Sequence, residues 1–123
     1  MKLIIAGSRN LLNEGGYWFD ELDQFREKLR YNSKKEITEV VCGMAKGADT
    51  IGKEWAEKHN IPVKEFPADW EKYGKAAGPI RNKQMADYAD TAIVIYNPDV
   101  SKGSKNMVEQ MKKIGKPVFE VTL

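Results

Sequence analysis

Short apolar runs alternate with amphipathic stretches along the whole chain, and this alternation constrains the fold more than any other feature. Five apolar runs predict strands, at residues 3–6, 39–42, 62–66, 92–96 and 117–121. Apolar residues recur at helical spacing between them: Trp18, Leu22, Phe25 and Leu29, then Ile51 and Trp55, then Met85 and Tyr88, then Met107, Met111 and Ile114. This order predicts an α/β, Rossmann-like three-layer sandwich with a mostly parallel five-stranded sheet.

Length and composition narrow the class of protein further. A chain of 123 residues is expected to form a single domain over residues 1–123. Twenty Lys and Arg against 18 Asp and Glu leave a net charge of +2, which argues against a protein that coats nucleic acid. The lone Cys42 fits a reducing compartment and a buried small hydrophobe better than a nucleophile. We therefore expect a cytoplasmic protein with no membrane segment, because the apolar start is too short for one.

The predicted fold indicates where a ligand would bind. In open α/β sheets, ligands bind beyond the carboxyl ends of the strands, where loops lead into helix N-termini. Four segments are predicted to lie at this edge as loops, namely residues 7–10, 43–49, 67–79 and 97–105.

Cations occupy these segments, although helix N-termini normally favour acidic residues. The five are Arg9, Lys46, Arg81, Lys102 and Lys105. Pro79 is predicted to begin the helix that carries Arg81. Helix amides together with Arg and Lys form anion sites, so the set predicts a phosphate site. The alternative is that each side chain is simply solvated.

Glycines and Asp49 fit the same interpretation. Gly7, Gly43, Gly47 and Gly103 fall in strand-to-helix turns, where a missing Cβ admits a ligand or serves turn geometry alone. Neither a G-x-G-x-x-G fingerprint after the first strand nor a Walker P-loop is present. Asp49 is predicted to cap a helix that begins at Thr50, with contact to a ribose hydroxyl as the alternative.

The remaining candidates leave catalysis open. Trp70 and Tyr73, predicted to lie in a polar loop, could stack on a base or close over the edge of the core. Glu109 and Asp99 are candidate acid–base groups, with solvated surface positions as the alternative. His59 has no partner spacing typical of a metal site. From the residues, we expect a phosphate-containing small molecule as ligand and neither a metal nor a cofactor.

Four motifs in order carry a resemblance to a known family. They are Gly7-Ser8-Arg9, Cys42 to Asp49, Gly78-Pro79-Ile80-Arg81-Asn82 and Lys102-Gly103-Ser104-Lys105. Together they resemble the YspA/cpYpsA-related SLOG domain family of bacteria and phages, over essentially the whole chain. The resemblance implies a Rossmann-like protein that binds a nucleotide or a nucleotide-derived ligand as a sensor or sequestering module. The resemblance is also compatible with a homodimer.

Two related families define the alternatives. The stretch from Arg81 through Val94, followed by Gly103-Ser104, is similar to the LOG-type phosphoribohydrolases, which cleave the base–ribose bond of nucleoside monophosphates. Met107 stands where their pattern has a catalytic Glu, which argues against hydrolysis; if the chain were an enzyme, Arg81 and Glu109 would be its candidates. Cys42 to Asp49 also resembles a motif of the DprA family, which binds single-stranded DNA. Nucleic acid is not the expected partner, because the chain lacks a strong basic excess.

Within the leading interpretation, each site residue has an expected role. Arg9, Arg81 and Lys105 would hold phosphate, and Gly43, Gly47 and Gly103 would admit it to backbone amides. Asp49 or Asn82 would contact the ribose. The other members of the predicted site are Gly7, Ser8, Lys46 and Ser104.

Overall fold

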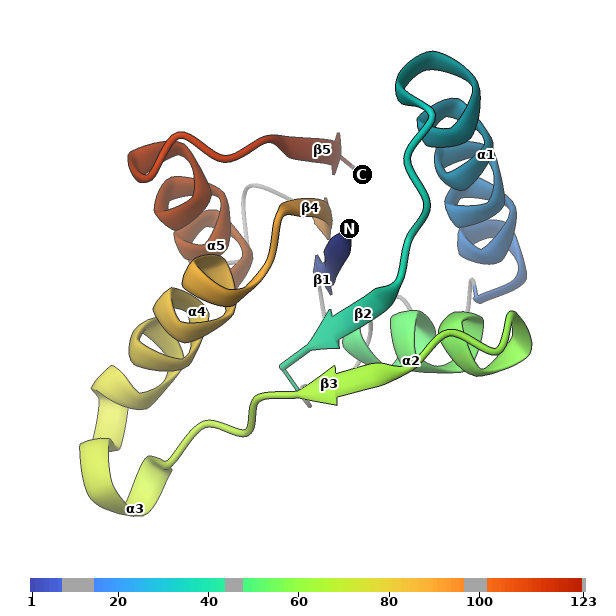
Figure 1. Ribbon diagram of the computed structural model, residues 1–123. Coiled ribbons are helices and arrows are strands. Elements are labelled where there is room, and N and C mark those ends of the chain that lie inside the picture. Colours follow the sequence, from blue (N-terminus) through green and yellow to red (C-terminus); the bar gives the residue numbers. More distant parts are fainter. Residues whose placement is uncertain (8–14, 44–47, 97–101, 123) are drawn as a thin grey trace.

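The computed structural model describes residues 1–7, 15–43, 48–96 and 102–122 (Figure 1). The strands are β1 (Lys2–Gly7), β2 (Glu39–Cys42), β3 (Val63–Glu65), β4 (Thr91–Tyr96) and β5 (Val118–Thr122). The helices are α1 (Gly15–Ser33), α2 (Ala48–Lys58), α3 (Trp70–Tyr73), the 3-10 turn η2 (Gly74–Ala76), α4 (Ala77–Tyr88) and α5 (Lys102–Lys113). All five predicted strands are present, and no strand begins or ends more than one residue from its predicted boundary.

The strands form one sheet in the order β3-β2-β1-β4-β5, and every pairing is parallel. In the register of the central strand, Ile4 lies opposite Val41 of β2 and Ala92 of β4. The predicted α/β, Rossmann-like class is confirmed. Because all strands run the same way, their carboxyl ends meet at one edge of the sheet, as the predicted site requires.

Helices cover both faces of the sheet (Figure 1). Leu3 and Ile5 of β1 pack in a core cluster with residues of α1 and α2, whereas Ile4 and Ala6 pack in a second cluster with residues of α4 and α5. Successive side chains of a strand point to opposite faces, so one apolar run supplies both clusters. No helix in the described ranges is long and apolar enough to cross a membrane.

Three local predictions were wrong at the boundaries of α2, α3 and α4. The segment 67–79 is not a loop, because α3 and η2 fill most of it. Asp69 caps α3 by accepting a hydrogen bond from the Lys72 amide at 3.1 Å, and Gly74, with φ of +55°, ends it. Pro79 is accordingly the third residue of α4 rather than its first. Asp49 lies inside α2, which begins at Ala48, so it does not cap a helix that begins at Thr50.

The far end of α4 is held by one side chain. Lys116 Nζ donates hydrogen bonds to the carbonyl oxygens of Ala86, Asp87 and Ala89 at 2.7, 3.0 and 2.7 Å. These carbonyls lie at the C-terminus of α4, where acceptors have no partner within the helix and where a positive charge is favoured. Lys116 therefore anchors α4 to the segment between α5 and β5.

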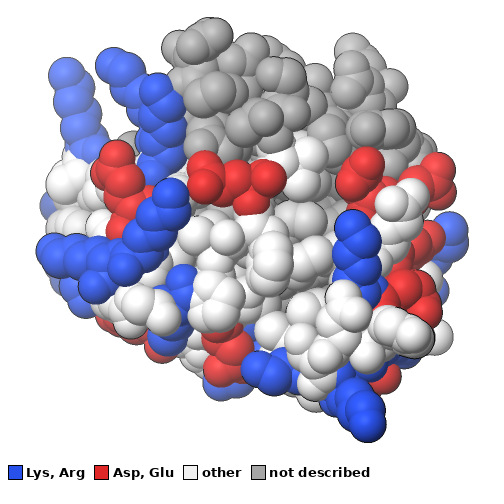
Figure 2. Space-filling view, turned by 90° about the horizontal axis from the view of Figure 1, so that it is seen from above, with Lys and Arg blue, Asp and Glu red and all other residues white. Residues whose placement is uncertain are grey.

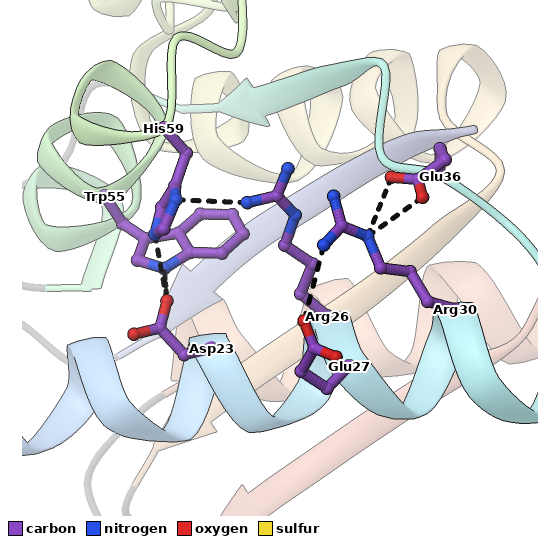
Figure 3. A network of polar contacts seen from close by, with 7 residues as sticks. All are labelled: Asp23, Arg26, Glu27, Arg30, Glu36, Trp55 and His59. Atoms are coloured by element: carbon purple, nitrogen blue, oxygen red, sulfur yellow. Dashed lines mark hydrogen bonds and ion pairs between the residues drawn. The ribbon is translucent and has the colours of Figure 1, made fainter.

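A polar cluster joins α1 to α2 (Figure 3). Asp23 Oδ1 accepts hydrogen bonds from Trp55 Nε1 at 2.8 Å and from His59 Nε2 at 2.9 Å, while Arg26 Nη1 lies 3.0 Å from His59 Nδ1. A guanidinium can only donate, so in this arrangement His59 Nδ1 is the acceptor and Nε2 the donor. The hydrogen bond from the Trp55 indole, with His59, holds the pKa of the Asp23 carboxyl below its usual value.

Gly52 sets how closely α2 approaches the sheet. A Cβ built on Gly52 would lie 2.7 Å from Cγ2 and 2.8 Å from Cβ of Ile5, which belongs to the central strand. Ile5 is completely buried and branched at Cβ, so it cannot move away without displacing its neighbours.

We expect Gly52→Ala to destabilise the fold by about 1–3 kcal/mol, because the cost of overpacking exceeds the gain in helix propensity. Gly103→Ala is the matched control, since a Cβ on that glycine of α5 meets no atom within 4 Å. The control is expected to leave stability unchanged or to raise it slightly. Urea unfolding compares the two variants, and a Gly52→Ala protein as stable as the control would contradict the close packing.

Asp23→Asn is expected to lower stability by about 0.5–1 kcal/mol at neutral pH, since the carboxylate is partly exposed. A lowered pKa in the folded state means that the charge contributes above about pH 4 and that its contribution is lost as pH falls through the folded pKa. The difference from the unaltered protein should therefore shrink in acid. Urea midpoints at pH 7 and pH 3 test this, with the exposed Asp20→Asn of the same helix as control. A difference that persists in acid would contradict an electrostatic role.

Candidate functional site

One hydrogen-bonded network brings together three segments at the carboxyl edge of the sheet. Arg81 Nη1 donates to the carbonyl oxygen of Gly43, directly after β2, and Arg81 Nε donates to Asn82 Oδ1 at 3.1 Å. Asn82 Nδ2 donates to the Gly103 carbonyl oxygen at 3.2 Å and to Asn106 Oδ1 at 3.0 Å. The network joins the end of β2, the first half of α4 and the first turns of α5. It contains four residues predicted for the site, namely Gly43, Arg81, Asn82 and Gly103.

Asn82 is the buried centre of this network, with 6% of its surface exposed. A buried amide needs partners for both its oxygen and its nitrogen, because burying unpaired polar groups costs free energy. Asn82 finds a donor on α4, Arg81 Nε, and two acceptors on α5, so it fixes the two helices relative to each other. The Asn82 side chain therefore holds α4 and α5 in place at the carboxyl edge of the sheet and does not point into solvent.

The glycine at position 43 is required by the Arg81 side chain. A Cβ built on Gly43 would lie 2.8 Å from Arg81 Nη1 and 3.0 Å from its Cζ. Any larger residue would push the guanidinium away from the end of β2. The space that a side chain at position 43 would fill is thus occupied by the guanidinium of Arg81, the fifth residue of α4.

The first turn of α5 carries the other predicted residues. Gly103 and Lys105 are exposed, as is Lys102, with which the helix begins, whereas Ser104 is buried. Gly103 and Ser104 were predicted to lie in a loop, but both are helical. Exposed backbone and cations in the first helical turn form a surface that favours an anion.

Groups for acid–base chemistry do not converge on the network. Met107, at the position of the Glu in the LOG-type pattern, is buried with the side chains of α4, β1 and β4. Glu109 is exposed on α5. The hydrogen bonds that form the network among the described residues include no carboxylate. Asp99 lies outside the described residues.

Two exposed aromatic residues stand beside α4. Trp70 and Tyr73 belong to α3, not to a loop, and are 56% and 39% exposed. The ring of Trp70 faces the first turn of α4, since its Cη2 would lie 3.5 Å from a Cβ on Gly78. Lys72 Nζ lies 5.0 Å from the centre of the Tyr73 ring. Neither aromatic side chain is buried in the core.

Several predicted site residues lie outside the part of the chain that the structure describes. Ser8, Arg9, Lys46 and Gly47 lie outside the described residues, and so does the side chain of Asp49. Gly7 ends β1 at the same edge of the sheet, opposite Ile95. Sequence reasoning missed Asn106, because nothing in the order of residues pairs it with Asn82. It also missed the Asp23–His59 pair, which joins α1 to the turn directly after α2; the single His in the chain was the available signal.

Residues 1–73 match the YspA, cpYpsA-related SLOG family. The "Gene 61 protein" of Mycobacterium phage D29 is 30% identical over an alignment of 123 positions, which covers 96% of this chain and 94% of the phage protein. Among solved structures, DNA processing protein A (DprA) from Streptococcus pneumoniae is similar with a TM-score of 0.72 and 21% identity. That match covers 97% of this chain but 49% of DprA, so the chain spans about half of the DprA length. The DprA likeness supports the fold.

Asn82→Ala is expected to cost about 1–3 kcal/mol of stability, because it removes the buried amide that makes three part-buried hydrogen bonds. Gln84→Ala, an exposed change on the same helix, is the control and should be nearly neutral. Thermal and urea unfolding of both variants measure the difference. Equal stability of the two variants would show that the Asn82 network does not hold α4 to α5.

Proposed function

Because the chain belongs to the YspA, cpYpsA-related SLOG family, we propose that it binds a nucleotide or nucleotide-derived small molecule through its phosphate. The proposed site is the carboxyl edge of the sheet, around Gly43, Arg81 and the first turn of α5. Family membership and the DprA-like fold support a nucleotide-related or DNA-processing role. The choice of a small molecule within that role rests on the geometry of the edge.

The observation that carries the proposal is the convergence of Arg81, Gly43 and Gly103 through a single network. A phosphate needs several donors at fixed positions, and a guanidinium held by two contacts presents its charge with little loss of side-chain entropy on binding. Arg81 is held in this way by the Gly43 carbonyl and the Asn82 amide. Exposed Lys105 and the amides at the start of α5 add positive potential beside it.

The roles expected from the sequence are adjusted by these contacts. Arg81 and Lys105 remain the proposed phosphate ligands, together with Arg9, and Gly43, Gly47 and Gly103 remain the places where backbone lies close to the ligand. Asn82 is proposed as a positioning residue, because its amide nitrogen already serves Gly103 and Asn106. Asp49 keeps the proposed ribose contact.

Trp70 is the better of the two candidates for stacking on a base. Its ring lies against the first turn of α4, the helix that carries Arg81 less than one turn beyond Gly78. Aromatic stacking on a base contributes about 1–3 kcal/mol and tolerates any base. Tyr73 is the second candidate.

We propose binding without turnover. Cleavage of a base–ribose bond needs a group that activates water or assists formation of the oxocarbenium ion. Met107 fills the corresponding position in the LOG-type pattern and packs in the core. Glu109, the remaining candidate on α5, is an exposed surface residue.

A thermal-shift screen tests the proposal with nucleoside mono-, di- and triphosphates, ADP-ribose, NAD and cyclic oligonucleotides. A ligand at a hundred times its dissociation constant adds about 2.7 kcal/mol, which should raise the unfolding midpoint by several degrees. We expect Arg81→Ala to weaken binding of the active compound by about 1–3 kcal/mol. Each variant is compared with its own ligand-free midpoint, because Arg81 also supports the fold.

Two controls sharpen the experiment. Lys83→Ala removes an exposed cation of the same helix, paired with Asp87 at 2.9 Å, and should bind like the unaltered protein. Arg81→Lys keeps the charge but loses the planar fork, so it should bind with intermediate affinity. Chromatography of the same mixtures should detect no released base. The proposal fails if no phosphate compound shifts the midpoint, or if Arg81→Ala binds as tightly as the unaltered protein.

A further inference from the structure

The charge of this chain is distributed very unevenly. Helix α5 holds four lysines and one glutamate, whereas the rest of the chain holds 16 cationic and 17 anionic side chains. All of the net positive charge therefore resides on one helix, although the whole chain carries only +2. Figure 2 shows Lys and Arg side chains gathering on the side of the molecule where α5 lies in Figure 1.

The lysines form one row along the outer face of α5. At 3.6 residues per turn, Lys102, Lys105, Lys112 and Lys113 fall within an arc of about 100° and extend over about 16 Å. All four are exposed. Lys112 Nζ lies 3.4 Å from Glu120, and the other three have no ion pair with any described residue. Glu109, the one acidic residue of the helix, is exposed and falls within the same arc, so the row carries a net charge of +3.

We propose that this outer face of α5 is an interaction surface for the phosphodiester backbone of a nucleic acid, bound without regard to sequence. A row of cations without base-reading side chains matches evenly spaced phosphates, whose counterions are released on binding. Lys102 and Lys105 lie beside the phosphate site proposed above, but Lys112 and Lys113 lie at the opposite end of the helix from Gly103, so the surface extends well beyond that site. The inference therefore does not rest on that site.

Other polyanions fit this surface less well. A helix that binds a membrane surface inserts an apolar face into the lipid. The apolar face of α5, formed by Met107, Val108 and Met111, is already buried against α4 and the sheet. Interfaces with proteins are depleted in Lys and contain an apolar or aromatic centre, and the lysine row has none.

Fluorescence anisotropy with a labelled 20-nucleotide thymidine strand and a 20-base-pair duplex tests the proposal between 50 and 200 mM salt. If all four lysines contact phosphates of a single strand, the slope of log affinity against log salt is about 2.8, a loss of roughly 50-fold over this range. Lys112→Gln combined with Lys113→Gln should halve the slope to about 1.4, a loss of roughly 7-fold. Tighter binding of the duplex than of the single strand, with a slope of about 0.9 per lysine, would identify the double-stranded form as the ligand.

The matched control is Lys28→Gln combined with Lys35→Gln, which removes the same charge from exposed positions on and after α1. This control should keep the full salt dependence. Arg81→Ala should also keep it, while Lys112→Gln/Lys113→Gln should keep any thermal shift caused by a nucleotide, so the two sites are tested independently. The thermal midpoint of each variant verifies folding.

Two results would overturn the proposal. One is no binding of either oligonucleotide at 50 mM salt; co-sedimentation with phosphatidylserine vesicles would in that case assign the lysine row to a membrane. The other is an equal loss of salt dependence in the Lys28/Lys35 control, which would reflect net charge alone.

Discussion

A parallel sheet has to be covered on both faces, and in this protein the central strand β1 carries that requirement. Its side chains alternate, with Leu3 and Ile5 directed to one layer of helices and Ile4 and Ala6 to the other. The approach of α2 to this strand depends on Gly52, which leaves room for the branched side chain of Ile5. The spacing between α2 and the sheet follows from this contact, because interiors are close-packed and do not yield easily.

The candidate site is built on the same packing. Once α4 and α5 cover one face of the sheet, their first turns lie side by side, and the buried amide of Asn82 joins them. Arg81 then extends from α4 to the end of β2, where Gly43 leaves room for it. At the other end of α4, Lys116 donates to three carbonyl groups. The helix that carries the proposed phosphate ligand is thus held by polar contacts at both ends.

The distribution of charge shows why a total can mislead. A net charge of +2 indicates no preference for polyanions, and for that reason nucleic acid was not the expected partner. Four lysines are nevertheless concentrated on one exposed helix face, because the opposite face of α5 is committed to the core by Met107 and Met111. The field at a surface depends on which charges share a face, and this is a property of the folded helix.

Much of the fold could be predicted from the order of residues. Apolar runs and helical spacing are local patterns, so they predicted five strands, the helices between them and the edge at which a ligand would bind. Boundaries were less accurate at α3 and α4, where Asp69 caps a short helix that the polar composition had suggested to be a loop. The same reasoning placed Asn82 in the site and offered it, as the alternative to Asp49, for contact with a ribose, since its burial was not visible from the sequence.

The amino-acid sequence by itself determined the fold class, the order of the strands and helices, and the chemistry gathered at the ends of the strands. Each of these follows from neighbours along the chain, whose periodicity and turn chemistry act over a few residues. The tertiary structure alone decided that Arg81 meets Gly43, that Asn82 bridges to Asn106, and that His59 meets Asp23. Those contacts join residues 24 to 38 positions apart, and they exist because the packing of helices on the sheet, not any local preference, brings them together.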